Sequence, residues 1–157
     1  MNERILVPLD GSKVGEAALP YVEDLASKLS PEVKAEVTLI QVVSSLSHYV
    51  IAGEASASIP YSEAEIRQIT KKAKEYLTKA GEGLRNKGVM VKTKVAVGDA
   101  ADEIIKVADE IRADLIAMST HGRSGISRWA FGSVTDKVLR GGNKPVLIVR
   151  APKEAQT

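Results

Sequence analysis

The stretch RILVPLDGS, residues 4 to 12, decides the fold class of this 157-residue chain. Its apolar residues run through to Leu9 without alternation, which is typical of a strand buried on both faces. Asp10-Gly11-Ser12 then turns the chain, and Ser12 is the expected N-cap of a helix. Apolar residues follow at steps of three or four, as on one face of a helix: Val14, Ala18, Val22, Leu25 and Leu29. The stretch therefore predicts a buried strand that leads into an amphipathic helix.

The same alternation continues down the chain. Further strands are predicted at 37–43, 89–97, 114–118 and 145–149, and further helices at 61–88, 99–111 and 133–139. Residues 89–97 alternate valine and lysine, which indicates an edge strand, whereas 114–118 is apolar throughout and is expected to be central. Residues 44–60 have no clear period and are predicted to form a loop. We expect one α/β domain over residues 1–150, with an open, mostly parallel five-stranded sheet, helices on both faces and a polar tail at 151–157.

Composition and charge exclude several classes of protein. The 22 basic residues nearly balance the 20 acidic ones, so we expect no nucleic-acid partner. The absence of cysteine excludes disulfides and cysteine nucleophiles. The first apolar run is interrupted by Pro8 and Asp10, unlike a signal peptide, and no apolar run is long enough to span a bilayer. We therefore expect a cytoplasmic protein without a membrane partner.

Strand ends are the place to look for a ligand, because open parallel sheets bind ligands beyond the carboxyl ends of their strands. Asp10, Val42 and the pair Met118-Ser119 lie at such ends. After the last of these comes STHGRSGISRWAFGSVTD, residues 119 to 136, which is rich in glycine and serine and leads into a helix. Glycine lets backbone N–H groups approach a phosphate, and a helix start adds free N–H donors. Ser133 and Asp136 could instead form a capping box, and both interpretations can hold together.

Other motifs are missing from the chain. No G-x-x-x-x-G-K-[ST] is present, so this is not a Walker loop, and no G-x-G-x-x-G supports a dinucleotide site. Ile126 stands where a nucleophile elbow needs glycine, which argues against a hydrolase. We predict no catalytic residue and no metal-ligating residue.

Three separated motifs, in this order, resemble the ATP-binding type of the universal stress protein family. They are ILVPLDGS at 5–12, MSTHGRSG at 118–125 with FGSVT at 131–135, and KPVLIV at 144–149. The family pattern G-x2-G-x9-G-[ST] is met by Gly122, Gly132 and Ser133, whereas its first glycine is replaced by Ser119. The Cβ of Ser119 would crowd the backbone where the ribose or phosphates pass. The resemblance covers the chain to Arg150 and implies a Rossmann-like sheet in the order 3-2-1-4-5.

The resemblance also implies a site. Asp10 would meet the ribose, Pro8 and Val42 would line the adenine, and Met118 and Ser119 would flank the nucleotide. The full set of implied nucleotide-binding residues is Pro8, Leu9, Asp10, Ser12, Val42, Met118, Ser119, Gly122, Arg123, Gly132, Ser133, Val134 and Thr135. The ligand would be ATP or another adenine nucleotide, with any Mg²⁺ held mainly by the phosphates.

A homodimer would form through the last strand, at Val146, Leu147, Ile148 and Val149. The expected role is stress-related regulation, in which the nucleotide state tunes the dimer or an unknown protein partner. A slow Mg²⁺-dependent ATPase or phosphotransferase and a dimeric scaffold without nucleotide stay open as alternatives.

Overall fold

The computed structural model describes residues 1–44, 47–53, 55–121 and 132–152. Its main sheet contains β1 (Asn2–Pro8), β2 (Lys34–Val43), β5 (Met90–Val97), β6 (Leu115–His121) and β7 (Val146–Ala151). All four pairings are parallel, and the order is β5-β2-β1-β6-β7. Counted within this sheet the order is 3-2-1-4-5, so the predicted Rossmann-like fold is confirmed. As expected, β5 lies at an edge and β6 lies inside the sheet.

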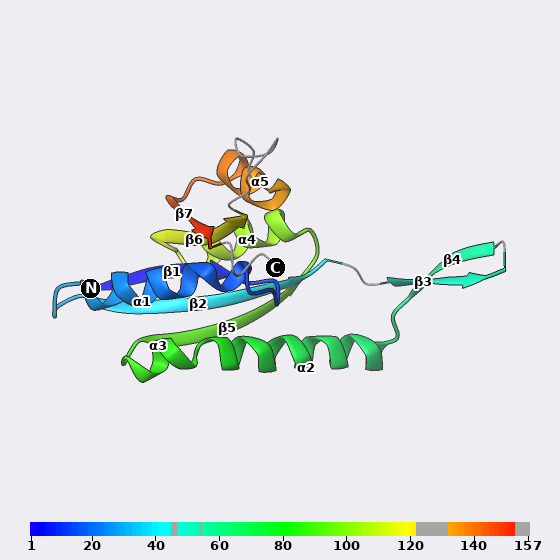
Figure 1. Ribbon diagram of the computed structural model, residues 1–157, viewed down its shortest axis with the longest axis horizontal. Coiled ribbons are helices and arrows are strands. Elements are labelled where there is room, and N and C mark those ends of the chain that lie inside the picture. Colours follow the sequence, from blue (N-terminus) through cyan, green and yellow to red (C-terminus); the bar gives the residue numbers. More distant parts are fainter. Residues whose placement is uncertain (45–46, 54, 122–131, 153–157) are drawn as a thin grey trace.

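Helices cover both faces of this sheet (Figure 1). One face carries the short 3-10 helix η1 (Gly15–Ala18) with α1 (Leu19–Ser27), α2 (Glu63–Ala80) and α3 (Glu82–Asn86). The other face carries α4 (Ala100–Glu110) and α5 (Ser133–Gly141). None of the helices in the described ranges is long and apolar enough to cross a membrane.

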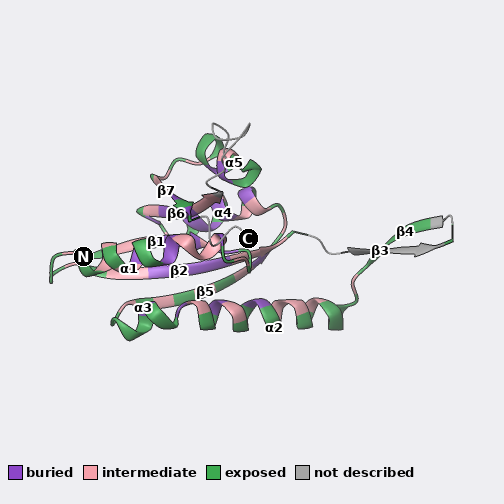
Figure 2. Ribbon diagram, viewed as in Figure 1, coloured by how far each residue is buried: buried purple, intermediate pink, exposed green. Residues whose placement is uncertain are grey.

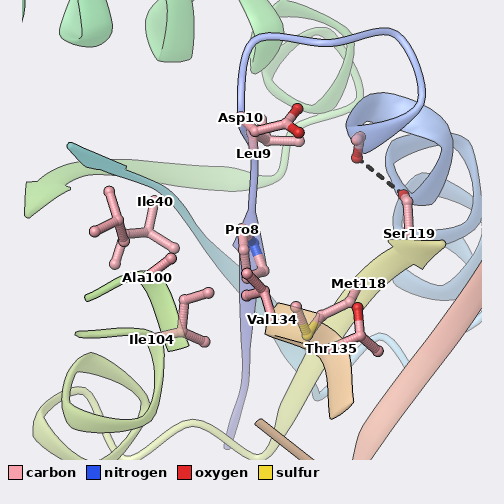
Figure 3. A pocket seen from close by; sticks show the side chains of 12 residues that line it. Pro8, Leu9, Asp10, Ile40, Ala100, Ile104, Met118, Ser119, Val134 and Thr135 are labelled. Atoms are coloured by element: carbon pink, nitrogen blue, oxygen red, sulfur yellow. Dashed lines mark hydrogen bonds between the residues drawn. The ribbon is translucent and has the colours of Figure 1, made fainter. Parts of the chain in front are cut away.

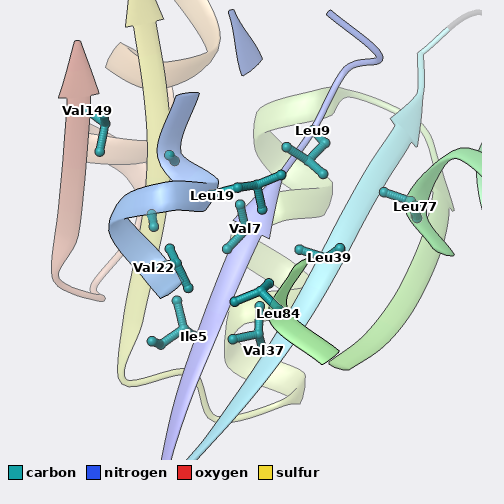
Figure 4. Packing of buried hydrophobic residues seen from close by; sticks show 12 residues of the cluster. Ile5, Val7, Leu9, Leu19, Val22, Val37, Leu39, Leu77, Leu84 and Val149 are labelled. Atoms are coloured by element: carbon teal, nitrogen blue, oxygen red, sulfur yellow. The ribbon is translucent and has the colours of Figure 1, made fainter. Parts of the chain in front are cut away.

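Side chains of β1 feed both halves of the core, which explains its unbroken apolar run. Ile5 and Val7 pack toward α1, α2 and α3 (Figure 4), whereas Leu6 between them packs toward α4 and α5. All three are fully buried. Figure 2 shows the buried residues gathered along the central strands, while β5 alternates buried and exposed positions as an edge strand does. The two-residue period of the strand therefore places neighbouring apolar residues in separate clusters.

The predicted loop at 44–60 was wrong, because this segment contains an antiparallel hairpin. Strand β3 (Ser47–Ala52) pairs with β4 (Ala55–Pro60), and the hairpin projects away from the main sheet (Figure 1). The segment is rich in serine and alanine and has little apolar periodicity, so its pairing left no clear sequence signal.

Helix boundaries differ from prediction at three places. The helix expected to run to Gly88 breaks at Gly81, where an added Cβ would lie 3.0 Å from the Val91 side chain, so helix and sheet approach closely there. Ser12 does not cap the first helix; instead its hydroxyl accepts a bond from the Gly15 N–H at 3.1 Å. The predicted Ser133 cap was also wrong. Gly132 is the N-cap of α5, no side chain bonds there, and Ser133 is the first helical residue.

Candidate functional site

A cavity of about 170 Å³ opens where the sheet reverses its order, between the carboxyl ends of β1 and β6 (Figure 3). The neighbouring end of β2 and the first turns of α4 and α5 complete its walls. A reversal of this kind leaves two adjacent crossovers on opposite faces of the sheet, and the space between them is the usual ligand site of open α/β folds. The cavity is lined by Pro8, Leu9, Asp10, Gly15, Ile40, Val42, Ala100, Ile104, Met118, Ser119, Val134 and Thr135.

The structure brings most of the predicted site residues together around this cavity. Those that line it are Pro8, Leu9, Asp10, Val42, Met118, Ser119, Val134 and Thr135. Ser12, Gly132 and Ser133 do not line it, although each adjoins a residue or turn that does. Gly122 and Arg123 lie outside the described residues. Of the predicted interface, Val149 is buried by its own chain, whereas Val146, Leu147 and Ile148 are half-buried on edge strand β7.

Four lining residues were missed by sequence reasoning: Gly15, Ile40, Ala100 and Ile104. Ile40 and Ile104 belong to periodic apolar patterns that the sequence assigns only to the core. Ala100 follows Asp99, which the sequence places at a strand end, so the start of α4 could have been flagged. Gly15 carries no local signal, because its place depends on how η1 packs against β6.

One part of the cavity is apolar. Ile40, Val42, Ile104 and Met118 provide aliphatic and thioether surface from two strands and one helix (Figure 3). Apolar protein cavities on the order of 150 Å³ hold a molecule the size of benzene. The space therefore suits a flat ring, and its walls have the character of ligand pockets that bind by shape and apolar contact.

Asp10 supplies the acidic group at the rim of the cavity. Its Oδ1 accepts hydrogen bonds from the Ser12 N–H, at 2.9 Å, and from the Ser12 hydroxyl. These bonds are possible because Gly11 takes a left-handed φ of 87°, which folds the chain back directly after the strand. Gly15 lies so close that an added Cβ would be 2.6 Å from Oδ1. The second carboxylate oxygen, Oδ2, makes none of the hydrogen bonds found in the described residues, so it can accept from a ligand hydroxyl.

Tyr76 reaches toward the same turn from α2. Burial raises the pKa of Tyr76 to about 12, and the carboxylates of Glu16 and Asp10 contribute to the rise, while the Gly11 N–H opposes it. The hydroxyl is buried, and among the described residues it makes no hydrogen bond of good geometry, even with the Gly11 N–H. The turn that carries Asp10 therefore rests against a neutral phenol that stays protonated at physiological pH.

Helix α5 begins on the opposite side of the cavity from Asp10, with Val134 and Thr135 in the wall (Figure 3). The first N–H groups of a helix have no partner within it and carry partial positive charge. Ser133 is exposed, and its hydroxyl is not used as a cap. A Cβ added to Gly132 would meet nothing within 4 Å, so the approach to this helix start is open.

An ion-pair cluster fixes α5 relative to α4. The Lys137 Nζ lies 3.0 Å from the Asp99 Oδ1 and 3.3 Å from the Asp102 Oδ1. Asp99 is the N-cap of α4 and accepts the Asp102 N–H, and this bond together with Lys137 lowers the pKa of the Asp99 carboxyl. The two helix starts that border the cavity are therefore tied by side chains on its outer side.

Ser119 joins the end of β6 to η1. Its hydroxyl accepts the Ala18 N–H at 2.8 Å and donates to the Gly15 carbonyl at 2.9 Å, the bond drawn dashed in Figure 3. The residue that departs from the glycine pattern is thus fully hydrogen-bonded within the chain. No group of three or more His, Cys, Asp or Glu side chains that could hold a metal is found among the described residues.

An open parallel sheet with a half-apolar, half-acidic cavity at its reversal point defines the chain as a Rossmann-like α/β protein. The model of the universal stress protein family matches residues 1–150. Universal stress protein MJ0531 of Methanocaldococcus jannaschii is 32% identical over 155 residues, which cover 98% of this chain and 85% of that protein. The chain belongs to the universal stress protein family.

Solved structures agree with the fold. The structure of protein MJ0577 of the same organism superimposes with a TM-score of 0.71 at 28% identity, covering 96% of this chain and 97% of that one. A universal stress protein family member from Arabidopsis thaliana, solved with AMP bound, gives a TM-score of 0.67 at 15% identity over 99% of this chain and 95% of that chain. At that identity the second likeness bears on the fold.

Proposed function

We propose that this protein binds an adenine nucleotide, ATP in the first place, in the cavity between β1 and β6. The observation that carries the proposal is the convergence of eight predicted residues from separate parts of the chain on one ring-sized cavity. The adenine would occupy the apolar part beside Val42 and Met118, and Asp10 would accept hydrogen bonds from the ribose hydroxyls. The AMP-bound relative from Arabidopsis thaliana supports an adenine ligand for this fold.

The phosphates would extend toward the start of α5. Free N–H groups at a helix start favour anions, and the unused Ser133 hydroxyl adds a donor there. Gly122 and Arg123, which lie outside the described residues, belong to the same proposed set through the family pattern. Any Mg²⁺ would be held mainly by the phosphates, with Ser133 as the side-chain oxygen best placed in sequence to join them.

The proposed role is regulatory. A single nucleotide-binding domain over residues 1–150, with the tail 151–157, would act in the cytoplasm as a homodimer whose partner contacts depend on nucleotide state. Edge strand β7 supports the dimer, because an unpaired apolar edge invites pairing with another chain. The half-buried residues Val146, Leu147 and Ile148 would be covered in that interface.

The first test is mass spectrometry of the protein purified without added nucleotide, followed by calorimetric titration with ATP, with and without Mg²⁺. Co-purified adenine nucleotide or micromolar affinity would support the proposal. A protein that binds no nucleotide under either condition would refute it and favour the scaffold alternative. Steady hydrolysis that Ser133→Ala removes while ATP still binds would identify a slow ATPase instead.

The site itself is tested by Gly132→Val. The open space around Gly132 accommodates the side chain without cost to the fold, so unfolding should change little. The added bulk would nevertheless obstruct phosphates at the start of α5. We expect weaker ATP binding with adenosine binding retained, and unchanged ATP binding would refute the phosphate assignment.

A further inference from the structure

The Ser119 hydroxyl connects two segments that lie about a hundred residues apart in sequence. It is partly buried, accepts from Ala18 at 2.8 Å and donates to Gly15 at 2.9 Å. A serine hydroxyl has one proton to donate, and here it is committed to the Gly15 carbonyl. Ser119 therefore has no proton left for a ligand, and its bonds instead hold η1 against the end of β6.

Gly15 is bonded in turn to the turn that carries Asp10. Its N–H donates to the Ser12 hydroxyl at 3.1 Å, and that hydroxyl donates to the Asp10 carboxylate. The Gly15 Cα also lies against the same carboxylate, since a Cβ there would come within 2.6 Å of Oδ1. Contacts at both faces of Gly15 thus join Ser119 to Asp10 through hydrogen bonds and close packing.

We propose that Ser119 is a positioning residue for recognition of the ribose. By fixing η1, the hydroxyl sets the place of Gly15 and Ser12, and these two hold the Asp10 carboxylate at the wall of the cavity. The inference rests on the proposed function, because its ligand is the nucleotide of that site. Glycine, which the family pattern has at this position, carries no hydroxyl and cannot make these bonds.

The specificity that follows concerns the sugar. A carboxylate held in one orientation binds a ribose with little loss of side-chain freedom, and it distinguishes a ligand with both hydroxyls from one that lacks the 2′-hydroxyl. When η1 is released, Asp10 samples other orientations and the advantage of the ribonucleotide falls. Ser119 thereby favours ATP over 2′-deoxy-ATP although it touches neither hydroxyl.

A steric role for Ser119 makes the opposite prediction. If the Cβ of Ser119 mainly crowds the nucleotide, Ser119→Gly should bind ATP more tightly than the wild type does. If the hydroxyl positions Asp10, Ser119→Ala and Ser119→Gly should both bind ATP more weakly. The two variants thus separate crowding from positioning by the sign of the change.

The test is a double-mutant cycle on the full chain. Calorimetry measures the Kd of ATP and of 2′-deoxy-ATP for wild type, Ser119→Ala, Ser119→Gly, Asp10→Asn and Ser119→Ala combined with Asp10→Asn. We expect each Ser119 variant to weaken ATP by about 10-fold, in line with the loss of one or two hydrogen bonds, and to bring the two ligands' Kd values together. Once Asp10 is replaced, Ser119→Ala should have no further effect, because it acts through that carboxylate.

Three outcomes would overturn the inference while leaving ATP binding established. They are tighter binding by Ser119→Gly, an equal loss for both nucleotides, and an effect that simply adds to that of Asp10→Asn. A wild type that binds neither nucleotide would overturn the proposed function and this inference together. Amide hydrogen exchange at Ala18 provides a readout without ligand: protection of this N–H should fall in Ser119→Ala, and unchanged protection would show that the hydroxyl does not hold η1.

Discussion

Replacing Gly15 by alanine should separate ligand binding from stability. Gly15 lies in η1, where alanine is the better residue, since glycine in a helix costs roughly 0.5–1 kcal/mol relative to alanine. However, the new Cβ would lie 2.6 Å from the Asp10 Oδ1, closer than real Cβ contacts allow. Because Asp10 is exposed, its carboxylate can rotate away into solvent, and the fold can relieve the clash without moving the backbone.

The two effects have different magnitudes. Rotation of Asp10 breaks its bonds to Ser12 at the surface, which offsets the helical gain, so the free energy of unfolding should change by less than about 1 kcal/mol. A hydrogen bond from a ligand to a charged group contributes about 1.5–3 kcal/mol. Loss of the ribose contact should therefore weaken adenosine and ATP alike by roughly 10- to 150-fold.

Calorimetry with adenosine and ATP, alongside urea denaturation, checks the prediction. Gly83→Ala is the matched control, because its Cβ would lie 2.6 Å from the Glu23 Oε1, in another helix and away from the cavity. It should leave both affinities unchanged. If Gly15→Ala is stably folded and binds adenosine as tightly as the wild type, Asp10 does not hold the ribose and the reasoning fails.

Tyr76→Phe should be neutral or slightly stabilising in urea denaturation at pH 7, because it removes a buried hydroxyl without a hydrogen-bond partner among the described residues. Wild-type stability should fall as pH rises from about 10 to about 12, since the unfolded phenol ionises near 10 and the folded one only at about 12, and the variant should lack that decline. Leu77→Ala, at a fully buried position of α2, should cost about 2–5 kcal/mol in the same assay. Asp99→Asn should destabilise at neutral pH, and its difference from wild type should vanish as the pH falls below about 4 and through the lowered pKa of the Asp99 carboxyl. Ile148→Lys should convert the proposed dimer to a monomer in light scattering, and a dimer that persists would exclude β7 as the interface.

The hairpin β3–β4 illustrates where sequence reasoning failed. Its strands pair only with each other in the described residues, away from the core, so no alternation between buried and exposed positions is required of them. The break at Gly81 has a different cause. The apolar stripe continues from Leu77 to Leu84 across the break, and only the close approach of Val91 shows why the helix is interrupted.

By itself the sequence determined the fold class and the position of the cavity. A strand buried on both faces must be apolar throughout, as around Leu6, and a helix covering it must repeat its apolar residues every three or four positions, so these elements are visible locally. Parallel strands bring their carboxyl ends to one edge, which is why Asp10 and Met118 could be expected near each other. These inferences need only the periodicity of each element.

Only the tertiary structure decided how the site is held. Ser119 and Ala18 are 101 residues apart, and their bond depends on the packing of η1 against the end of β6. Gly15 and Ile104 likewise become cavity walls only when their helices are placed over the sheet. Periodicity fixes which face of an element is apolar, whereas contacts between elements depend on their relative placement to within a few ångström, and no local pattern specifies that distance.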